Sequence, residues 1–449
     1  MLRDAKKTNG LSPQRAILMY YLIALILATG LLSIPVIYSD GSIPFIDTVF
    51  IAASALSVTG LSTVTLVETF NQAGYIIIMF LMNLGGIGIM AVGTLVWLLI
   101  GRKISVRERR QIMTDNARHQ TSGAVRMVLD IFSVLLLVEF IGAIIYVSYF
   151  YNATGDFAYA LLHGTFLSVS ATTNGGLDLY SNSLVHQSGN FIIQIPVMCQ
   201  IILGAIGYPV LIEVKHYFRK KSPGFNFSLF TKVTVSTHAI LLVIGMFFIL
   251  LLELPRFFKD KNILNSIVDS LFLSTTTRSG GITTVPVDQL AEPTQVIMSM
   301  LMFIGASPSS AGGGIRTTTF IILVLFLVSF VKGRQDVNVF KKRIAKIDIH
   351  RAFAVFILAM ILVFFGVLTI LITEGDKFTV IQIIFEVTSA FGTVGVSTGI
   401  TPDLSILSKV IIILFMFIGR IGFVSFLLSI AGKKRELTYR YPEERLMVG

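Results

Sequence analysis

The residues of this chain with the clearest chemical potential are polar, glycine-bearing stretches placed between long apolar segments. One of them is FGTVGVSTG at 391–399, which contains Thr393, Val394 and Gly395. The backbone carbonyls of such a loop can replace the water around a dehydrated cation. Glycine allows the chain to turn those carbonyls inward, because it adopts positive φ and has no side chain. The chemistry that this loop suggests is selective cation binding.

Three other stretches of the chain share the same pattern. The four are FIAASALSVTGLST (50–63), FLSVSATTNGGLDL (166–179), LFLSTTTRSGGITT (271–284) and FEVTSAFGTVGVST (385–398). Aligned on Gly60, Gly176, Gly281 and Gly395, each has a Ser or Thr six positions before the glycine and a branched aliphatic residue directly after it. The glycines are 116, 105 and 114 residues apart, and a fixed long period indicates repeated structural units. The candidate cation-binding residues are Val58, Thr59, Gly60, Asn174, Gly175, Gly176, Ser279, Gly280, Gly281, Thr393, Val394 and Gly395.

The composition indicates that these loops are carried by a membrane protein. Of 449 residues, 54% are hydrophobic and 14% are charged, whereas soluble domains are about one quarter charged. A bilayer-spanning helix needs roughly 20 apolar residues. We therefore predict an all-α polytopic membrane protein with eight transmembrane helices. The segments of sufficient length are 16–37, 75–100, 127–150, 191–214, 235–254, 295–330, 352–373 and 409–431.

The placement of charge predicts the topology. Most Lys and Arg residues lie in 1–15, 102–126, 215–232, 332–351 and the tail after residue 432. Every second connection is thus basic, as expected of cytoplasmic loops. We predict a multi-pass protein of the cell membrane with both termini cytoplasmic. The net charge of +11 then reflects topology and contacts with anionic membrane lipids, and we expect no nucleic-acid partner.

The repeated unit is a span, a short helix that cannot cross the bilayer, a glycine loop and a second span. Irregular backbone at membrane depth survives only when it is buried in protein or lines water. Four equivalent loops meet this demand by facing a common axis, so we predict four pore repeats around a pseudo-fourfold pore. The short helices would direct the partial negative charge of their C-terminal ends toward that axis. The predicted repeats cover 1–104, 105–222, 223–336 and 337–449.

The third repeat breaks its second span with GASPSSAGGG, where the other repeats have GGIG (85–88), GAIG (204–207) and GRIG (419–422). Glycine and proline at this density do not sustain a regular helix. We expect a loop below the glycine loops that blocks the ion path and swings aside. The alternative is a passive kink. The predicted gate residues are Gly305, Ala306, Ser307, Pro308, Ser309, Ser310, Ala311, Gly312, Gly313 and Gly314.

Two of the arginines inside the predicted membrane region carry specific expectations. Arg420 belongs to GRIG, and an intramembrane cation is costly unless it is paired or hydrated. We expect Arg420 to donate hydrogen bonds to carbonyls of the 305–314 loop and to form the gate with it. Arg278 lies three residues before Gly281. For Arg278 we favour a salt bridge behind the loop with Asp269 or Asp288; the alternative is a charge in the ion path.

These motifs and their order resemble the Trk/Ktr/HKT superfamily of potassium transporters, and within it the bacterial Ktr membrane subunit. The resemblance covers about residues 15–432, and each aligned glycine falls where the family has its filter glycine. It implies a K⁺ selectivity filter, a homodimer with one pore per chain, an intramembrane gating loop at 305–314 and a basic residue at the position of Arg420. It also implies an ordered C-terminal tail that reaches the dimer interface.

The resemblance further implies a cytosolic ring of RCK-type regulatory subunits that binds ATP or ADP, because the chain itself has no nucleotide motif. The basic segments 101–126 and 332–351 are the expected docking surfaces; the alternative is that their charges only set the topology. Each loop has one matched glycine where tetrameric potassium channels have two, so discrimination against Na⁺ is expected to be less strict. The sequence leaves two roles open for Na⁺: it activates the transport of K⁺, or it is co-transported with K⁺.

Two other classes of function are a symporter and an enzyme. A Na⁺/K⁺ symporter working by alternating access also uses broken helices, but such proteins typically have two larger repeats and intramembrane carboxylates. An enzyme is not expected, because the chain lacks HExxH, GxSxG and GxxxxGK[ST] motifs. Its single cysteine, Cys199, excludes an internal disulfide and a multi-cysteine metal site. No covalently bound cofactor is expected.

Overall fold

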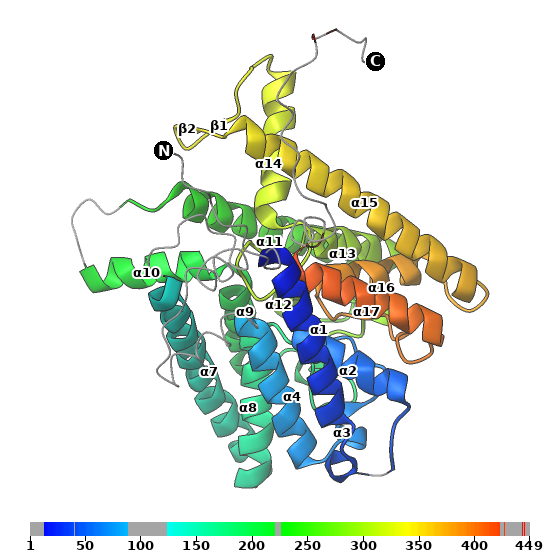
Figure 1. The fold of residues 1–449 in the computed structure, drawn as a ribbon. Helices are drawn as coiled ribbons and strands as arrows, with labels where there is room; N and C mark the ends of the chain where they lie inside the picture. Colours follow the sequence, from blue (N-terminus) through cyan, green and yellow to red (C-terminus); the bar gives the residue numbers. More distant parts are fainter. Residues whose placement is uncertain are drawn as a thin grey trace, which may run out of the picture.

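The computed structural model describes residues 13–39, 41–88, 124–220 and 226–422, together with residues 426, 442 and 444. This part of the chain is helical, apart from one antiparallel ribbon of β1 (Asn338–Val339) and β2 (Lys342–Arg343) (Figure 1). Several predictions lie outside the described residues. They are the N-terminal tail, most of the basic segment 102–126 and of the C-terminal tail, and the ends of spans 75–100 and 409–431 beyond residues 88 and 422.

Each of the four sequence units opens with a long helix. These helices are α1 (Pro13–Leu32), α7 (Ala124–Thr154), α11 (Leu229–Glu253) and α15 (Lys346–Glu374). They are the four helices in the described part that are long and apolar enough to cross a membrane. Their apolar faces are largely uncovered, as expected of helices that contact lipid. The prediction of an all-α membrane protein with several spanning helices is confirmed.

The second long segment of each unit is shorter in the structure than in the prediction. These helices are α4 (Gln72–Ile87), α9 (Phe191–Ala205), α13 (Glu292–Ile304) and α17 (Ile406–Ile421). Each is followed by a glycine with positive φ, a conformation that ends a helix. The four glycines are Gly88 (95°), Gly207 (100°), Gly305 (69°) and Gly422 (86°). The eight-span count therefore stays a prediction, since the described residues contain four spans, or five with one bent pair.

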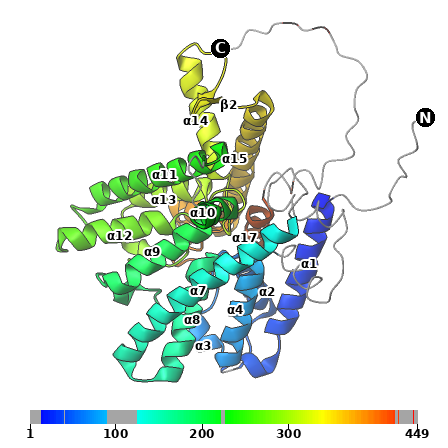
Figure 2. The same cartoon turned by 90° about the vertical axis from the view of Figure 1, so that its left-hand side faces the viewer.

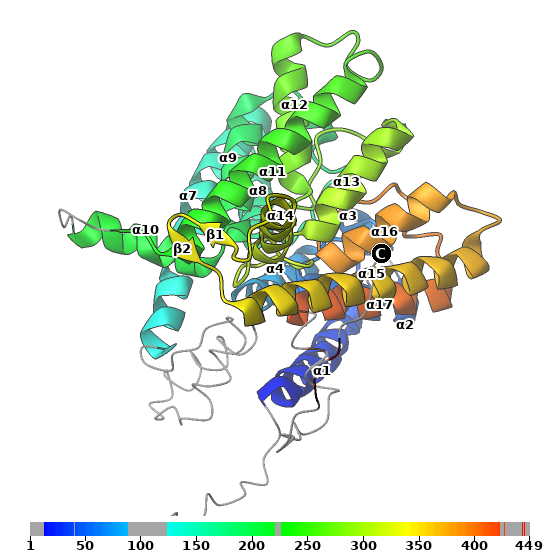
Figure 3. The ribbon, with the colours of Figure 1, turned by 90° about the horizontal axis from the view of Figure 1, so that it is seen from above.

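The predicted continuous span 191–214 is wrong. Helix α9 ends at Ala205, and the chain turns by 104° into α10 (Tyr208–Lys220), which projects to the side of the bundle (Figures 1 and 3). Gly207 adopts a positive φ in the turn, and Pro209 lies in the first turn of α10, where its missing N–H costs nothing. The Tyr208 N–H donates to the carbonyl of Ser309 at 2.8 Å, which fixes the direction of α10.

Between the two long helices of each unit lies a short helix with a buried C-terminal half. These are α2 (Phe45–Ser57), α8 (Phe157–Thr173), α12 (Ile263–Thr276) and α16 (Val380–Gly392). Side-chain caps fix the start of α8, α12 and α16, through Asp156, Asn262 and a Thr379–Gln382 capping box. The remaining elements are η1 (Pro35–Ile37), α3 (Leu66–Thr69), η2 (Val185–Gln187), η3 (Val287–Gln289) and α14 (Thr317–Val331).

The short helices and the second helices form a closed ring. Helix α4 packs against α8, α9 against α12, α13 against α16, and α17 against α2. The second helix of each unit thus contacts the short helix of the next, and the fourth unit returns to the first. Figure 2 shows α11, α12, α9 and α7 following one another along one side of this arrangement, and Figure 3 shows the helices from above.

A buried ion pair closes the ring. Lys409 of α17 donates to Asp47 of α2 at 2.8 Å, and the two side chains are 10% and 9% exposed. The pair joins residues 362 positions apart. Apolar side chains around it, including Phe50 of α2 and Met416 of α17, belong to one buried cluster. The first and fourth units are therefore joined by packing and by charge.

Lys409→Ala should destabilise the protein strongly, because it leaves the Asp47 carboxylate buried without its partner. Breaking a buried pair costs about 3–5 kcal/mol, which a thermal unfolding curve in detergent would reveal as a lower melting temperature. Lys377→Ala is the matched control: its partner is Glu374, but the Lys377 side chain is 62% exposed, and such pairs contribute about 0–1 kcal/mol. Equal melting temperatures for the two variants would contradict the assignment of Lys409 to the ring closure.

Candidate functional site

The four glycine loops adopt the same unusual backbone conformation. In each loop the aligned glycine has positive φ, at 97° for Gly60, 67° for Gly176, 75° for Gly281 and 91° for Gly395. The residue two positions before each glycine is left-handed as well, although it is not glycine. These are Val58 (55°), Asn174 (59°), Ser279 (80°) and Thr393 (47°). Left-handed non-glycine residues are uncommon, so their recurrence at one position relates the four loops in structure as well as in sequence.

Hydrogen bonds to the preceding helix hold three of the loops. In loops one, two and four, the N–H before the glycine donates to the carbonyl of the aligned hydroxyl residue, at 2.9 Å for Thr59–Ser54, 2.7 Å for Gly175–Ser170 and 2.9 Å for Val394–Ser389. In loops one and four, the hydroxyl also accepts from the glycine N–H, at 3.0 Å for Ser54 and 3.1 Å for Ser389. These bonds occupy the loop N–H groups and leave carbonyl oxygens free to face a ligand.

The third loop departs from this pattern. Gly280 N–H donates to the carbonyl of Thr276 at 2.7 Å, and the hydroxyl of Thr276 donates to Ile282 O at 2.6 Å. The aligned hydroxyl, Thr275, bonds back to Leu271 within its own helix. The physical reason is that α12 ends in a right-handed residue, Thr277, whereas the other short helices end directly in the left-handed residue. In the third loop, Thr276 therefore takes the structural place that the sequence alignment assigned to Thr275.

The four aligned glycines meet one another. A Cβ atom on Gly60 would lie 2.7 Å from the Cα of Gly176, and one on Gly176 would lie 2.8 Å from the Cα of Gly281. A Cβ on Gly395 would lie 2.8 Å from the Cα of Gly60, and one on Gly281 would lie 2.8 Å from the carbonyl oxygen of Val394. Four glycines from distant parts of the sequence, from Gly60 to Gly395, are thus brought together at one point. Any side chain there would collide with backbone.

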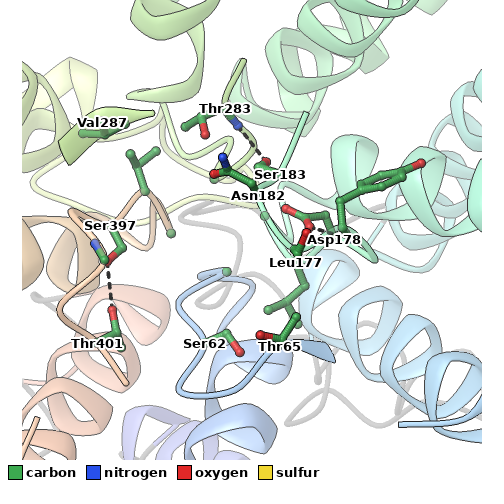
Figure 4. Close-up of a pocket in the computed structure, with 18 of the residues that line it drawn as sticks. Ser62, Thr65, Leu177, Asp178, Asn182, Ser183, Thr283, Val287, Ser397 and Thr401 are labelled. Carbon is green, nitrogen blue, oxygen red and sulfur yellow. Dashed lines mark hydrogen bonds between the residues drawn. The ribbon is translucent and has the colours of Figure 1, made fainter. Parts of the chain in front are cut away.

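Above this glycine ring lies a cavity of about 380 Å³, lined by all four loops and the segments that follow them (Figure 4). Asp178, Asn182 and Ser183 lie on one side of it, and Ser397 and Thr401 lie on another. The charged residues of the lining are two acids, Asp178 and Asp288, and no described basic residue lines it. The cavity is therefore electrostatically suited to cations.

Glu386 is a residue of this site that the sequence analysis missed. It is 1% exposed, within α16. Its carboxylate accepts from the Thr398 N–H at 3.2 Å, from the Thr401 hydroxyl at 3.1 Å and from the Ser397 hydroxyl. It thereby fixes the wall of the cavity that follows loop four. The signal in the sequence that could have identified it is a carboxylate inside a short helix that is mostly apolar.

Arg278 does not form the predicted salt bridge. Asp269 instead binds Lys261, with 2.9 Å between Nζ and Oδ2, and Asp288 is exposed at the cavity. The Arg278 side chain is fully buried, and its Nη1 donates to the carbonyl of Gly305 at 2.9 Å. The arginine therefore lies behind the third loop, as expected, but its partner is the backbone end of α13. Its Nε and Nη2 have no hydrogen-bond partner among the described residues.

Residues 305–314 form a largely buried loop directly beneath the glycine ring. A Cβ on Gly313 would lie 2.8 Å from the Thr393 hydroxyl, and one on Gly312 would collide with Ser279. Four N–H groups of the loop donate to carbonyls at the ends of other helices, at 3.0–3.2 Å. These bonds are Ser307 to Ala205, Ala311 to Gly204, Gly313 to Gly392 and Gly314 to Phe391. The loop is thus ordered by contacts with the second and fourth units.

Arg420 contacts this loop and the first unit together. Its guanidinium donates to Ala311 O in the loop, to Gly85 O and, at 3.1 Å, to Gly86 O at the end of α4. Arg316, which the sequence analysis did not single out, donates from its own guanidinium to Gly312 O and to Ser307 O. Both arginines line a cavity of about 40 Å³ on the side of the loop away from the glycine ring, with Ser309 and Ser310.

The model of a family described as TrkH, cation transport protein, matches residues 5–436 of this sequence. The chain belongs to the TrkH family. The resemblance inferred from the four glycine loops is thereby confirmed. The family transports cations across membranes and consists of transporters, in agreement with the expectation that the chain is not an enzyme.

Individual proteins agree with this assignment. The sequence is 43% identical to Ktr system potassium uptake protein D of Bacillus subtilis, with both chains covered completely. It is 32% identical to Ktr system potassium uptake protein B of the same organism (98% of this chain, 97% of that protein) and 32% identical to the potassium/sodium uptake protein NtpJ of Enterococcus hirae (98% of each). The crystal structure of the potassium transporter TrkH from Vibrio parahaemolyticus shares the fold, with a TM-score of 0.73 at 17% identity over 96% of this chain and 87% of that one.

The glycine ring predicts a sharp difference between two glycine substitutions in this TrkH-family chain. Gly395→Ala places a methyl group against Gly60 at a positive φ, so it should lower the melting temperature in detergent by several degrees or prevent recovery of folded protein. Gly30→Ala is the control, since a Cβ there has no neighbour within 4 Å and the position lies in helix α1. Size-exclusion elution and thermal unfolding measure both. Equal stability would contradict the close contact at Gly395.

Proposed function

We propose that this chain is the ion-conducting membrane subunit of a potassium uptake system. K⁺ passes along the axis where the four loops meet, and backbone carbonyls replace its hydration shell. The observation that carries this proposal is the convergence of four left-handed loops on four touching glycines. The substrate is supported by the relatives, which are named as potassium uptake proteins.

Carbonyl orientation supports the filter. The oxygens of Thr59, Gly175 and Val394 each lie within 3 Å of a Cβ position on an aligned glycine of another loop, so they point toward the shared centre. These oxygens precede the aligned glycine in loops one, two and four. We assign the filter to each aligned glycine and the two residues before it. These residues are 58–60, 174–176, 279–281 and 393–395.

The gate is the 305–314 loop together with Arg420. The loop lies across the path below the filter, and its bonds to the ends of α9 and α16 would have to break for it to move. Arg420 ties the loop to α4, and the positive charges of Arg420 and Arg316 oppose a cation in the closed state. Conduction then requires displacement of the loop and separation of Arg420 from Ala311.

The assembly that we propose is a homodimer, with each chain carrying one pore and a cytosolic RCK-type ring regulating both. ATP or ADP binds the ring and not this chain, and the ring docks on the basic segments 101–126 and 332–351. The chain lies in the cell membrane with both termini in the cytoplasm. These proposals rest on the family and on the placement of charge.

The decisive experiment is K⁺ uptake by cells that lack their own potassium transporters and express this chain with and without a cytosolic partner of this type. We expect growth at low K⁺ and Rb⁺ influx that increases with the membrane potential. Gly281→Ala should abolish influx, while Gly30→Ala should preserve it. No influx from the wild-type chain with its partner would refute the proposal.

Na⁺/K⁺ symport by alternating access is the second candidate, because one relative is named a potassium/sodium uptake protein. The two mechanisms differ in stoichiometry. A symporter moves Na⁺ in a fixed ratio to K⁺, whereas a pore that Na⁺ activates moves K⁺ in proportion to the driving force. Parallel ²²Na⁺ and ⁸⁶Rb⁺ fluxes in proteoliposomes distinguish them.

Arg420→Ala should increase K⁺ flux, because it removes both the tie between loop and α4 and a positive charge in the path. Deletion of several residues of 305–314 should have the same direction. The expected increase is about tenfold, as for loss of roughly 1.4 kcal/mol from the closed state. Flux into proteoliposomes measures it, with Arg256→Ala as the control, since that arginine is exposed and lies outside both the gate and the proposed docking segments. Unchanged flux in both gate variants would remove the gate assignment.

Asp178 predicts a dependence on external pH. Burial at the cavity raises the pKa of its carboxyl group to about 6, although hydrogen bonds from the Tyr180 N–H and Ser183 act in the opposite direction. The carboxylate is charged above this pH and neutral below it, so K⁺ uptake at low concentration should fall as external pH decreases through about 6. One unit charge close to the path contributes about 1 kcal/mol, which changes the uptake rate about fivefold. Asp178→Asn should give the low rate at every pH, whereas Asp288→Asn should retain the pH dependence; a sloping profile in Asp178→Asn would contradict the assignment.

A further inference from the structure

A second large cavity lies far from the glycine ring, between α14, α15 and the segment that connects them. Its volume is about 320 Å³, which is within the range of small-molecule binding sites. Its walls are mainly apolar and come from Phe326 and Phe330 of α14 and Ile349 and Phe353 of α15. Helices α14 and α15 pack against each other here, next to the ribbon of β1 and β2 (Figure 1).

The apolar wall is partly uncovered. Phe326 and Phe353 contact each other edge to face, with 4.9 Å between ring centres, while Phe330 is 71% exposed. Directly beside it, Val331 is 84% exposed and Leu327 is 56% exposed. The cavity therefore continues into an apolar helix surface that only lipid or another apolar surface would cover.

The lining of the cavity also contains cationic side chains. Arg334 and Lys346 line it and are exposed, together with His350. The segment 332–351 contains two acids, and neither lines the cavity. Asp336 binds Arg343 at 3.1 Å and Asp348 binds Arg351 at 3.6 Å. Among the described residues, therefore, no carboxylate lines the cavity beside Arg334 and Lys346.

The position of the cavity along the chain places it at the membrane surface. Lys346 is the first residue of α15, one of the long apolar helices, and the basic segment that precedes it has the composition of a cytoplasmic loop. Basic pockets at the ends of membrane helices on the cytoplasmic side are suited to anionic lipid headgroups. An apolar cavity with a cationic rim at this depth matches an amphiphile with an anionic head.

We infer that this cavity binds one anionic phospholipid of the inner leaflet. Its phosphate group lies against Arg334 and Lys346, and the upper part of an acyl chain lies along Phe326, Phe330 and Phe353. A small soluble anion would satisfy the two charges but leave the aromatic wall open, whereas a neutral lipid would cover the wall but not the charges. This inference does not depend on which ion the protein transports.

Tryptophan fluorescence tests the site directly, because the sequence contains one tryptophan, Trp97. In a Trp97→Phe background, Phe353→Trp places the only indole in the cavity wall. Full-length protein is reconstituted in nanodiscs that contain a small fraction of phosphatidylglycerol or phosphatidylcholine with brominated acyl chains. We expect strong quenching by the brominated phosphatidylglycerol and weak quenching by the brominated phosphatidylcholine at the same fraction.

Charge variants show whether the rim carries the selectivity. Arg334→Gln and Lys346→Gln should each reduce the preference for phosphatidylglycerol about fivefold, as expected for one basic residue at an anionic surface. The control is the double variant Lys341→Gln and Lys342→Gln, which removes two charges from the same segment without touching the cavity lining. Melting temperatures establish that each variant is folded.

Several outcomes would overturn the inference. Equal quenching by both lipids would show that the cavity does not select anionic lipid. Equal loss of preference in the Lys341/Lys342 control would show that the attraction comes from the charge of the whole segment and not from a specific site. Full competition by glycerol 3-phosphate would assign the rim to a soluble anion. The cavity would be assigned to protein docking if neither lipid quenched the indole and its fluorescence changed only when a cytosolic partner was added.

Discussion

The structure depends on how it satisfies the ends of helices that stop inside the bundle. A helix leaves its last carbonyls without intrahelical partners, and at membrane depth lipid cannot supply any. Here eight helices, four short and four second helices, end near one region. At the four short helices the chain turns into left-handed residues and brings four glycines into contact. Only backbone fits at that point, so carbonyl oxygens are the groups that line it.

The second helices solve the same problem in different ways, and the solutions are linked. The end of the second helix α9, like the end of the short helix α16, receives N–H groups from the 305–314 loop. The end of α4 receives the guanidinium of Arg420, and the end of α13 receives that of Arg278. Cationic side chains are favourable at helix C-termini for this reason. The loop and the arginines therefore act as caps of helix ends, and moving one of them exposes carbonyls that another group must cover.

The third unit is where the fourfold pattern is least exact, and its departures occur together. Its short helix ends in a right-handed residue where the others end in a left-handed one, and its arginine reaches from the glycine loop to Gly305, which follows its second helix. The chain thus has one contact that joins the third glycine loop directly to the beginning of the 305–314 loop. A symmetric assembly of four identical loops would have no such element. Internal duplication within a single chain allows it, because each unit can vary alone.

The sequence by itself determined the repeated motif, the aligned glycines, the long helices that open each unit and the break at 305–314. These follow from local rules: apolar length, residues that cannot continue a helix, and a period that identical units impose. The contact of Arg420 with the loop was also within reach, because an intramembrane cation must find carbonyls or acids.

Only the tertiary structure decided which groups meet. Hydropathy did not locate the 104° bend after α9, because the residues on both sides are apolar and the bend is fixed by a contact with Ser309, about 100 residues away. The pairing of Arg278 with Asp269 failed because Lys261, which precedes α12, binds Asp269, while Arg278, which follows α12, reaches the carbonyl of Gly305. Partners of buried charges and helix ends are set by packing between distant segments, and one sequence without its fold carries no record of those distances.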